Sequence, residues 1–141
     1  MAKYQLTEDA LTVNGRTLYR IIACVDFANV KSGEIGGYVE NEKNLSQGGN
    51  AWVGDNAKVY GDAEVGGNAE VGGNADYIVF KNWWSSGRYF TWTRSNDKYK
   101  VGCFYGSGEE LIQKAYRDSE KSGINYERIV RYVDTILADN R

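Results

Sequence analysis

The most regular pattern of apolar and polar residues in this chain runs from Val53 to Asp76. An aliphatic residue returns there at every sixth position, and a small residue follows each one four places later. The four hexads read VGDNAK, VYGDAE, VGGNAE and VGGNAD. A fixed short period indicates a repeat architecture. We expect the Val and Ala residues to point inward, because the first is apolar and suits an extended strand and the second is small. The Gly, Asn and Asp residues between them favour turns and would form the corners.

The same frame extends backwards, so the predicted repeat covers residues 35–76. With three hexads in each coil of a parallel β-helix, residues eighteen positions apart would lie above one another. The frame then predicts two inner columns, and an outer column whose alternating charges would favour strand pairing. The inner columns are Ile35, Val53, Val71 and Val39, Ala57, Ala75, and the outer column is Glu40, Lys58, Asp76.

Other patterns flank the repeat. Residues 1–34 predict an N-terminal β cap, in which Tyr4–Val13 and Arg16–Val25 pair around Asn14-Gly15, a dipeptide typical of hairpin turns. Residues 77–141 predict an α+β C-terminal domain. Its strands are expected in three aromatic, β-prone segments, 77–84, 88–94 and 98–105.

Apolar residues at helical spacing follow in residues 111–119 and 126–137, and Gly123 is expected to end the first helix. The predicted fold class is therefore mainly β with an α+β cap. A short parallel β-helix of hexapeptide repeats precedes a three-stranded antiparallel sheet that carries two helices.

The hexads resemble those of the left-handed hexapeptide-repeat β-helix family, whose consensus is an aliphatic residue, often Gly, two turn-prone residues, a small residue and any residue. The N-terminal part is similar to the opening of uncharacterised hexapeptide-repeat proteins of phages and prophages. Its matching segments are Leu18–Ile21, Val25–Phe27, Lys31–Glu40 and Asn44–Ser46. The resemblance implies a left-handed coil, a phage-type protein and a homotrimer as the oligomer.

Composition narrows the classes of partner. The net charge is −2, which gives no basic footprint for duplex nucleic acid. The sequence contains no apolar run long enough to cross a membrane and no signal-peptide pattern. Cys24 and Cys103 are expected to be buried free thiols in a reducing compartment. We therefore predict a cytoplasmic protein, in the host cytoplasm if a phage encodes it.

The chain contains no His, which bears on catalysis. Acyltransferases of the family that the hexads resemble use a His as general base, and carbonic anhydrases on that scaffold hold zinc with His. A Ser–His or Cys–His nucleophile is equally impossible. We predict no catalytic residue, no metal ligand and no cofactor, and an enzyme is not expected.

The strongest ligand candidate in the sequence is the strand at residues 88–94. Arginine pairs bidentately with phosphate and aromatic rings stack on nucleobases, so a nucleotide would suit this strand. In the alternative, Phe90 and Trp92 pack under the helices and the two Arg residues lie at the rim. The candidate binding residues are Arg88, Phe90, Trp92 and Arg94, with Trp83, Trp84 and Tyr105 nearby.

A second candidate is the loop Gly106-Ser107-Gly108, which precedes a predicted helix. Backbone amides at the start of a helix can hold an anion. In the alternative, Ser107 is an N-cap that forms a capping box with Glu110.

Two functions remain open. The first is a phage-type, non-enzymatic binding protein that captures a small nucleotide-like ligand and sequesters a host immune signal, an anti-defence role. The second is a structural or interaction module, in which a trimeric β-helix displays the C-terminal domain to a protein partner.

Overall fold

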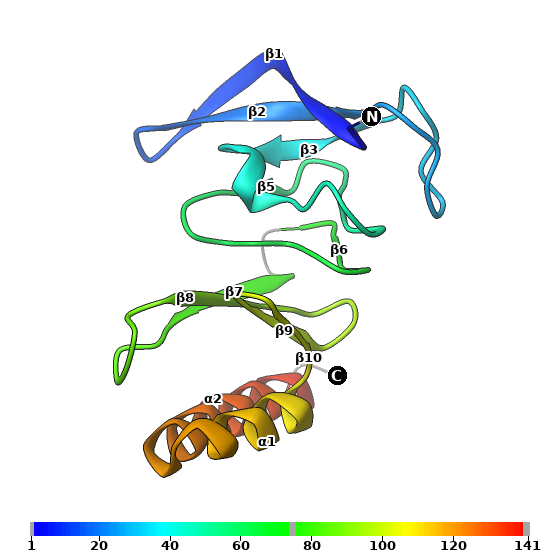
Figure 1. Ribbon diagram of the computed structural model, residues 1–141. Helices are drawn as coiled ribbons and strands as arrows, with labels where there is room; N and C mark the ends of the chain where they lie inside the picture. Colours follow the sequence, from blue (N-terminus) through cyan, green and yellow to red (C-terminus); the bar gives the residue numbers. More distant parts are fainter. Residues whose placement is uncertain (1, 74–75, 140–141) are drawn as a thin grey trace.

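A computed structural model describes residues 2–73 and 76–139. Figure 1 shows the chain built up in layers, with the N-terminal hairpin at one end and two helices at the other. Strands β1 (Tyr4–Val13) and β2 (Arg16–Ala23) pair in antiparallel fashion. Asn14 and Gly15 join them with positive φ angles of 50° and 80°, as a tight hairpin turn requires. The hairpin predicted from this dipeptide is confirmed.

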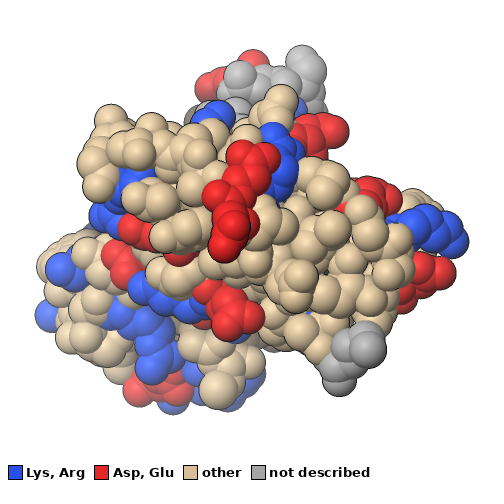
Figure 2. Space-filling model, turned by 90° about the horizontal axis from the view of Figure 1, so that it is seen from above, with Lys and Arg blue, Asp and Glu red and all other residues tan. Residues whose placement is uncertain are grey.

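The N-terminal sheet has four strands in the order β1-β2-β3-β5. Strand β3 (Ile35–Val39) is antiparallel to β2, and the two-residue strand β5 (Lys58–Val59) is parallel to β3. A short 3₁₀ helix, η1 (Glu42–Asn44), follows β3. Viewed from this end of the molecule, acidic and basic side chains lie among one another (Figure 2).

The parallel β-helix predicted as the fold class is wrong. The strands of residues 35–76 are short and belong to separate sheets. Strands β3 and β5 complete the mixed N-terminal sheet, whereas β4 (Trp52–Val53) and β6 (Glu70–Val71) form a parallel sheet of their own. The strands of the third sheet, nearer the C-terminus, are all antiparallel. Over the described residues the fold is mainly β, with three distinct sheets and two α-helices.

The predicted columns hold at one step and fail at others, because the register changes within the tract. Val53 does lie opposite Val71, eighteen positions on. Val39, however, lies opposite Val59, twenty positions on, rather than opposite Ala57. Ile35 is 52% exposed and pairs with Ile22, so it occupies no inner column.

The outer column fails for the same reason, because Lys58 lies opposite Tyr38 rather than Glu40. Ala75, assigned to the second inner column, lies outside the described residues.

The register change has a physical cause in the turn between Leu45 and Trp52. Leu45 bridges Val65 at an offset of twenty, but Trp52 faces Glu70 at an offset of eighteen, so the intervening turn holds two additional residues. Gln47, placed by the repeat frame at an aliphatic position, lies in this turn. Its amide accepts a hydrogen bond from the Lys3 N–H at 2.8 Å and donates one to the Tyr4 carbonyl at 3.1 Å.

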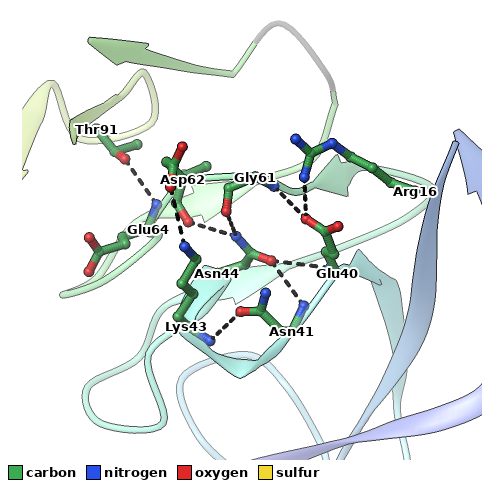
Figure 3. A network of polar contacts seen from close by, with 10 residues as sticks. Arg16, Glu40, Asn41, Lys43, Asn44, Gly61, Asp62, Glu64 and Thr91 are labelled. Carbon is green, nitrogen blue, oxygen red and sulfur yellow. Dashed lines mark hydrogen bonds and ion pairs between the residues drawn. The ribbon is translucent and has the colours of Figure 1, made fainter. Parts of the chain in front are cut away.

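The inward positions of the hexads between Val53 and Val71 are nevertheless buried. Their Val residues are at most 1% exposed, and the Ala residues at 57, 63 and 69 at most 2%. A buried polar group, Asn44, accompanies them. Its side-chain N–H₂ donates to the carbonyls of Gly61 and Ala63 at 3.1 and 2.8 Å, and its oxygen accepts from the amides of Glu40 and Asn41 (Figure 3). One side chain thus joins η1 to the following turn of the repeat.

The C-terminal sheet is antiparallel, with four strands in the order β10-β9-β8-β7. They are β7 (Tyr77–Lys81), β8 (Tyr89–Thr93), β9 (Lys98–Val101) and β10 (Phe104–Ser107). The predicted three-stranded sheet is wrong, because the segment 98–105 reverses direction at Gly102-Cys103. Gly102 has a φ of 57°, which lets Val101 lie opposite Phe104.

Two helices cover one face of this sheet (Figure 1). Helix α1 (Gly108–Asp118) ends at Ser119, whose backbone is extended, and α2 (Glu120–Asp139) begins directly after it. Gly123, predicted to end the first helix, lies inside α2 instead. A Cβ atom there would lie 2.3 Å from the Tyr116 ring, so the glycine allows the helices to pack closely.

The opposite face of the sheet packs on the repeat tract, through alternate residues of β8 and their neighbours. The Thr91 hydroxyl accepts from the Glu64 amide at 2.9 Å, and the Ser95 hydroxyl accepts from the Glu70 amide at 2.8 Å. Tyr105 lies against Gly67, where any Cβ would collide with its ring. The C-terminal sheet therefore lies between the repeat tract and the helices.

The two cysteines form no disulfide. Cys24 is half-buried and Cys103, in the β9–β10 turn, is exposed, so the prediction that both are buried is wrong. Among the described residues, no helix is both long and apolar enough to cross a membrane.

Candidate functional site: a polar hollow between sheet and helices

A hollow of about 470 Å³ opens where the β7–β8 turn, the β9–β10 turn and the two helices meet. Its volume falls within the roughly 300–1,000 Å³ of small-molecule sites. Val101 and Phe104 supply apolar surface on the sheet side, and Lys114 and Asp118 supply charges from α1. We call this site the polar hollow. Its lining residues are Asn82, Ser85, Ser86, Arg88, Val101, Phe104, Leu111, Lys114, Ala115, Asp118, Ser119, Ser122 and Tyr126.

The β7–β8 turn is shaped by hydrogen bonds across its base. The Asn82 amide donates to the Arg88 carbonyl at 2.7 Å, and the Gly87 amide donates to the Asn82 carbonyl at 2.9 Å. Gly87 has a φ of 73°, which its lack of a Cβ allows. This closure places the side chains of Asn82 and Arg88 together at the hollow.

Trp84 anchors the same turn to α2. Its ring is 8% exposed and meets the Tyr126 ring edge-on at a centroid distance of 4.9 Å. Its indole N–H donates to the Ser122 hydroxyl at 3.2 Å. Because these contacts attach the β7–β8 turn to α2, the two elements are held in fixed positions on either side of the hollow.

A buried polar pair lines the hollow. The Asn82 side-chain N–H₂ donates to the Tyr126 hydroxyl at 3.1 Å, and each residue is 6% exposed. The side-chain oxygen of Asn82 has no hydrogen-bond partner in the part of the chain that the structure describes. Burial raises the pKa of Tyr126, so its hydroxyl keeps its proton at neutral pH.

The two cations of the hollow differ in their partners. Lys114 lies 3.3 Å from Asp118, one helical turn on, so its charge is largely balanced. Arg88 has no carboxylate within ion-pairing distance among residues 2–73 and 76–139. Its guanidinium lies beside Gly102, where a side chain would collide with it. Arg88 is therefore the cation available to an anion here.

The aromatic residues predicted to bind a ligand lie mostly in the core. Phe90 and Trp92 are 0% and 2% exposed and pack under the helices, as the alternative interpretation of that strand proposed. Trp84 is buried beside them. Trp83 is 70% exposed and points away from the core. The structure thus does not assemble these rings into one open stacking surface.

The remaining predicted residues are dispersed. Arg94 is exposed at the far end of β8, where its backbone amide donates to the Asp76 carbonyl. Tyr105 lies on the sheet face that packs on the repeat, and the Lys98 ammonium sits 5.5 Å from its ring centre. Of the seven predicted residues, Arg88 lines the polar hollow.

The loop Gly106-Ser107-Gly108 begins α1 with a capping box. The Ser107 hydroxyl accepts from the Glu110 amide at 3.2 Å, and the Glu110 carboxylate accepts from the Ser107 amide at 2.9 Å. The hydrogen bond from the Ser107 amide lowers the pKa of Glu110. The capping alternative is confirmed. Anion binding at this loop stays a prediction, and the Glu110 carboxylate opposes it.

Sequence reasoning missed Asn82, Tyr126 and Lys114. Asn82 is a polar residue in the segment 77–84, which is rich in aromatic and β-branched residues, and this position was the available signal. Tyr126 lies 44 positions away from Asn82, so no local pattern could pair them.

A larger, open groove of about 760 Å³ lies beside the N-terminal sheet and the repeat. Its cation, Arg20, is already engaged by the Gly36 carbonyl, the Tyr38 hydroxyl and the Asn56 side chain at 2.7 to 3.0 Å. Asp55 and Glu70 lie along the same groove. These charges disfavour an anionic ligand, so the smaller polar hollow is the better candidate site.

Within the described residues, no three Cys, Asp or Glu side chains gather in a way that could hold a metal ion. Comparison of the chain with known protein families gives no match, and no curated protein shows significant similarity to it.

Proposed function

We propose that this protein binds a small nucleotide-like ligand in the polar hollow and retains it without converting it. The observation that carries the proposal concerns two neighbouring features of the hollow. The Arg88 guanidinium pairs with no carboxylate of the described residues, and it lies beside a buried polar pair in which the Asn82 oxygen has no hydrogen-bond partner among them. A small molecule that carries an anionic group and a polar ring system would pair with the Arg88 guanidinium through the first and with the buried polar pair through the second.

The parts of such a ligand match the walls of the hollow. Arg88 would pair with phosphate oxygens, an interaction in which guanidinium geometry gives two parallel hydrogen bonds. Phe104 and Val101 would lie against the flat face of a base. Because the chain has no His, the usual general base is missing, and binding without turnover is the simpler function.

The biological role that we propose follows from the resemblance of the N-terminal part to phage proteins. A phage protein that holds a nucleotide in the host cytoplasm would withdraw a host immune signal from its receptor. Sequestration of this kind requires tight binding of the nucleotide and no chemical conversion of it.

A panel of linear and cyclic nucleotides, screened by thermal unfolding, tests the proposal. A ligand at a hundredfold excess over Kd stabilises the folded state by about 2.7 kcal/mol. We expect Arg88→Ala to abolish the stabilisation and Arg94→Ala, at the other end of the same strand, to preserve it. Chromatography of the incubated nucleotide is expected to return it unchanged. Absence of stabilisation across the panel, or equal losses in both variants, would overturn the proposal.

A second candidate function is that of an interaction module, and the exposure of Trp83 favours it. This ring is 70% exposed at the tip of the β7–β8 turn, and exposed aromatic rings are frequent anchors of protein interfaces. Replacement of Trp83 by Ala would then abolish binding of a protein partner and leave nucleotide binding unchanged. The homotrimer stays a prediction, which light scattering would test directly.

A further inference from the structure

We infer that the ligand of the polar hollow presents a nucleobase edge, with one hydrogen-bond donor beside one acceptor, to the Asn82–Tyr126 pair. The inference rests on the proposed function and narrows it. The ligand class is a base-bearing nucleotide, as opposed to a sugar phosphate, a simple phosphate or a dicarboxylate.

The hydrogen bonds of the pair lead to this inference. The backbone N–H and C=O of Asn82 are both used to close the β7–β8 turn. One of its two side-chain N–H groups is donated to the Tyr126 hydroxyl, and its side-chain oxygen is free among the described residues. The Tyr126 hydroxyl accepts that bond and keeps its own proton to donate. The pair therefore offers one free acceptor, the Asn82 oxygen, beside at least one donor, the Tyr126 O–H.

The same result holds for either orientation of the Asn82 carboxamide. If the oxygen and nitrogen of the carboxamide are exchanged, the Tyr126 hydroxyl donates to the Asn82 oxygen. The Asn82 N–H₂ then remains as a donor, and a lone pair of the Tyr126 hydroxyl remains as an acceptor. At least one donor and one acceptor remain in both cases. A partner with the complementary pair of groups satisfies them together, which is the property of a nucleobase edge.

The surroundings of the pair favour a base over other groups with the same hydrogen bonds. Trp84 and Phe90 pack on the Tyr126 ring with centroid distances of 4.9 and 5.2 Å, so the hydroxyl is held by a rigid core. Phe104 and Val101 line the same hollow with apolar surface, and Arg88 supplies the charge for a phosphate. A nucleotide carries all three features on one frame.

Calorimetric titration of the full chain with three compounds tests the inference. Adenosine 5′-monophosphate has a base edge with a donor and an acceptor, purine riboside 5′-monophosphate lacks the exocyclic donor, and ribose 5-phosphate lacks the base. We expect the first to bind about tenfold more tightly than either of the others. In Asn82→Leu this preference should fall about tenfold, while the affinity for ribose 5-phosphate changes less than twofold.

Tyr126→Phe serves as a second variant, because it keeps the ring packing if Asn82→Leu does not fold. It is expected to lower the affinity for adenosine 5′-monophosphate and leave that for ribose 5-phosphate unchanged. Equal binding of all three compounds by the native chain would overturn the inference and leave phosphate binding intact. Equal losses for all compounds in the variants would show a structural role for the pair and overturn it too. If none of the compounds binds, the proposed function fails, and this inference fails with it.

Discussion

Asn82 and Tyr126, 44 positions apart, are joined by a buried hydrogen bond of 3.1 Å that ties the β7–β8 turn to α2. The bond fixes one side of the polar hollow, and Trp84 fixes the same turn a second time through Ser122. The site is thus built by contacts that depend on the completed fold.

Two Tyr→Phe substitutions should have opposite effects on stability. Tyr126→Phe removes the partner of the Asn82 N–H₂ and should lower the free energy of unfolding by about 1–3 kcal/mol. The buried Tyr99 hydroxyl has no partner among the described residues, so Tyr99→Phe should leave that free energy unchanged or raise it by about 1 kcal/mol. Urea denaturation of both variants measures the difference. A larger loss in Tyr99→Phe than in Tyr126→Phe would contradict this assignment.

Replacement of Asn44 by Ala should be strongly destabilising. Four backbone groups would lose a bond to its side chain (Figure 3). The Glu40 amide would keep its bond to the Val59 carbonyl at 3.2 Å, which leaves the Asn41 amide and the carbonyls of Gly61 and Ala63 without this partner. Because each buried unpaired group costs about 1–3 kcal/mol, we expect a loss of at least about 3 kcal/mol in unfolding free energy. The exposed Asn68 offers a matched control, whose replacement by Ala should change the value by less than about 0.5 kcal/mol. Similar values for the two variants would refute the structural role of Asn44.

Gly123→Ala tests the close packing of the helices. Alanine favours a helix more than glycine does, by about 1 kcal/mol, so local propensity alone predicts stabilisation. The new methyl group would lie 2.3 Å from the Tyr116 ring, and overpacking of this kind costs about 1–3 kcal/mol. We expect a net fall in melting temperature. Gly48→Ala, where the nearest atom lies 3.9 Å away, should be nearly neutral. A rise in melting temperature for Gly123→Ala would contradict the account.

The stability of the protein should rise between pH 8 and about pH 10, because of Lys3. Burial lowers the pKa of Lys3 from 10.5 to about 8, while its ammonium donates to the Ala51 carbonyl at 2.6 Å. Below pH 8 both the folded and the unfolded states are protonated, and the full cost of burying the charge is present. Between pH 8 and about 10.5 the folded state releases the proton first, so the free energy of unfolding increases.

Urea denaturation at pH 7, 8, 9 and 10 would measure this dependence, and Lys3→Met should remove it. Above about pH 10 the trend should reverse. Burial raises the pKa values of Tyr4 and Tyr99, so these phenols ionise first in the unfolded state. An unchanged pH profile in Lys3→Met would show that another group is responsible.

Local signals in the sequence predicted the local structure correctly. Asn14-Gly15 predicted its hairpin, and Ser107 with Glu110 predicted the capping box, because each depends on neighbouring residues alone. The fold class was not predictable in this way. The two additional residues between Leu45 and Trp52 change the register of the repeat without breaking its composition.

The candidate site was predictable only in part, since Arg88 was identified and Asn82 and Tyr126 were not. The positions of Phe90 and Trp92 depend on which face of the sheet the helices cover. That choice is made by contacts between distant segments, which strand periodicity does not reveal.

The most direct test of the central claim is a nuclear magnetic resonance titration of the isotope-labelled chain with adenosine 5′-monophosphate. We expect the side-chain N–H₂ signals of Asn82 and the Nε–H signal of Arg88 to shift together and to saturate at one Kd. The Nε–H signal of Arg94 and the side-chain amide of Asn68 should stay in place. Shifts confined to those two control signals, or no shifts at all, would contradict the assignment of the polar hollow as a nucleotide site.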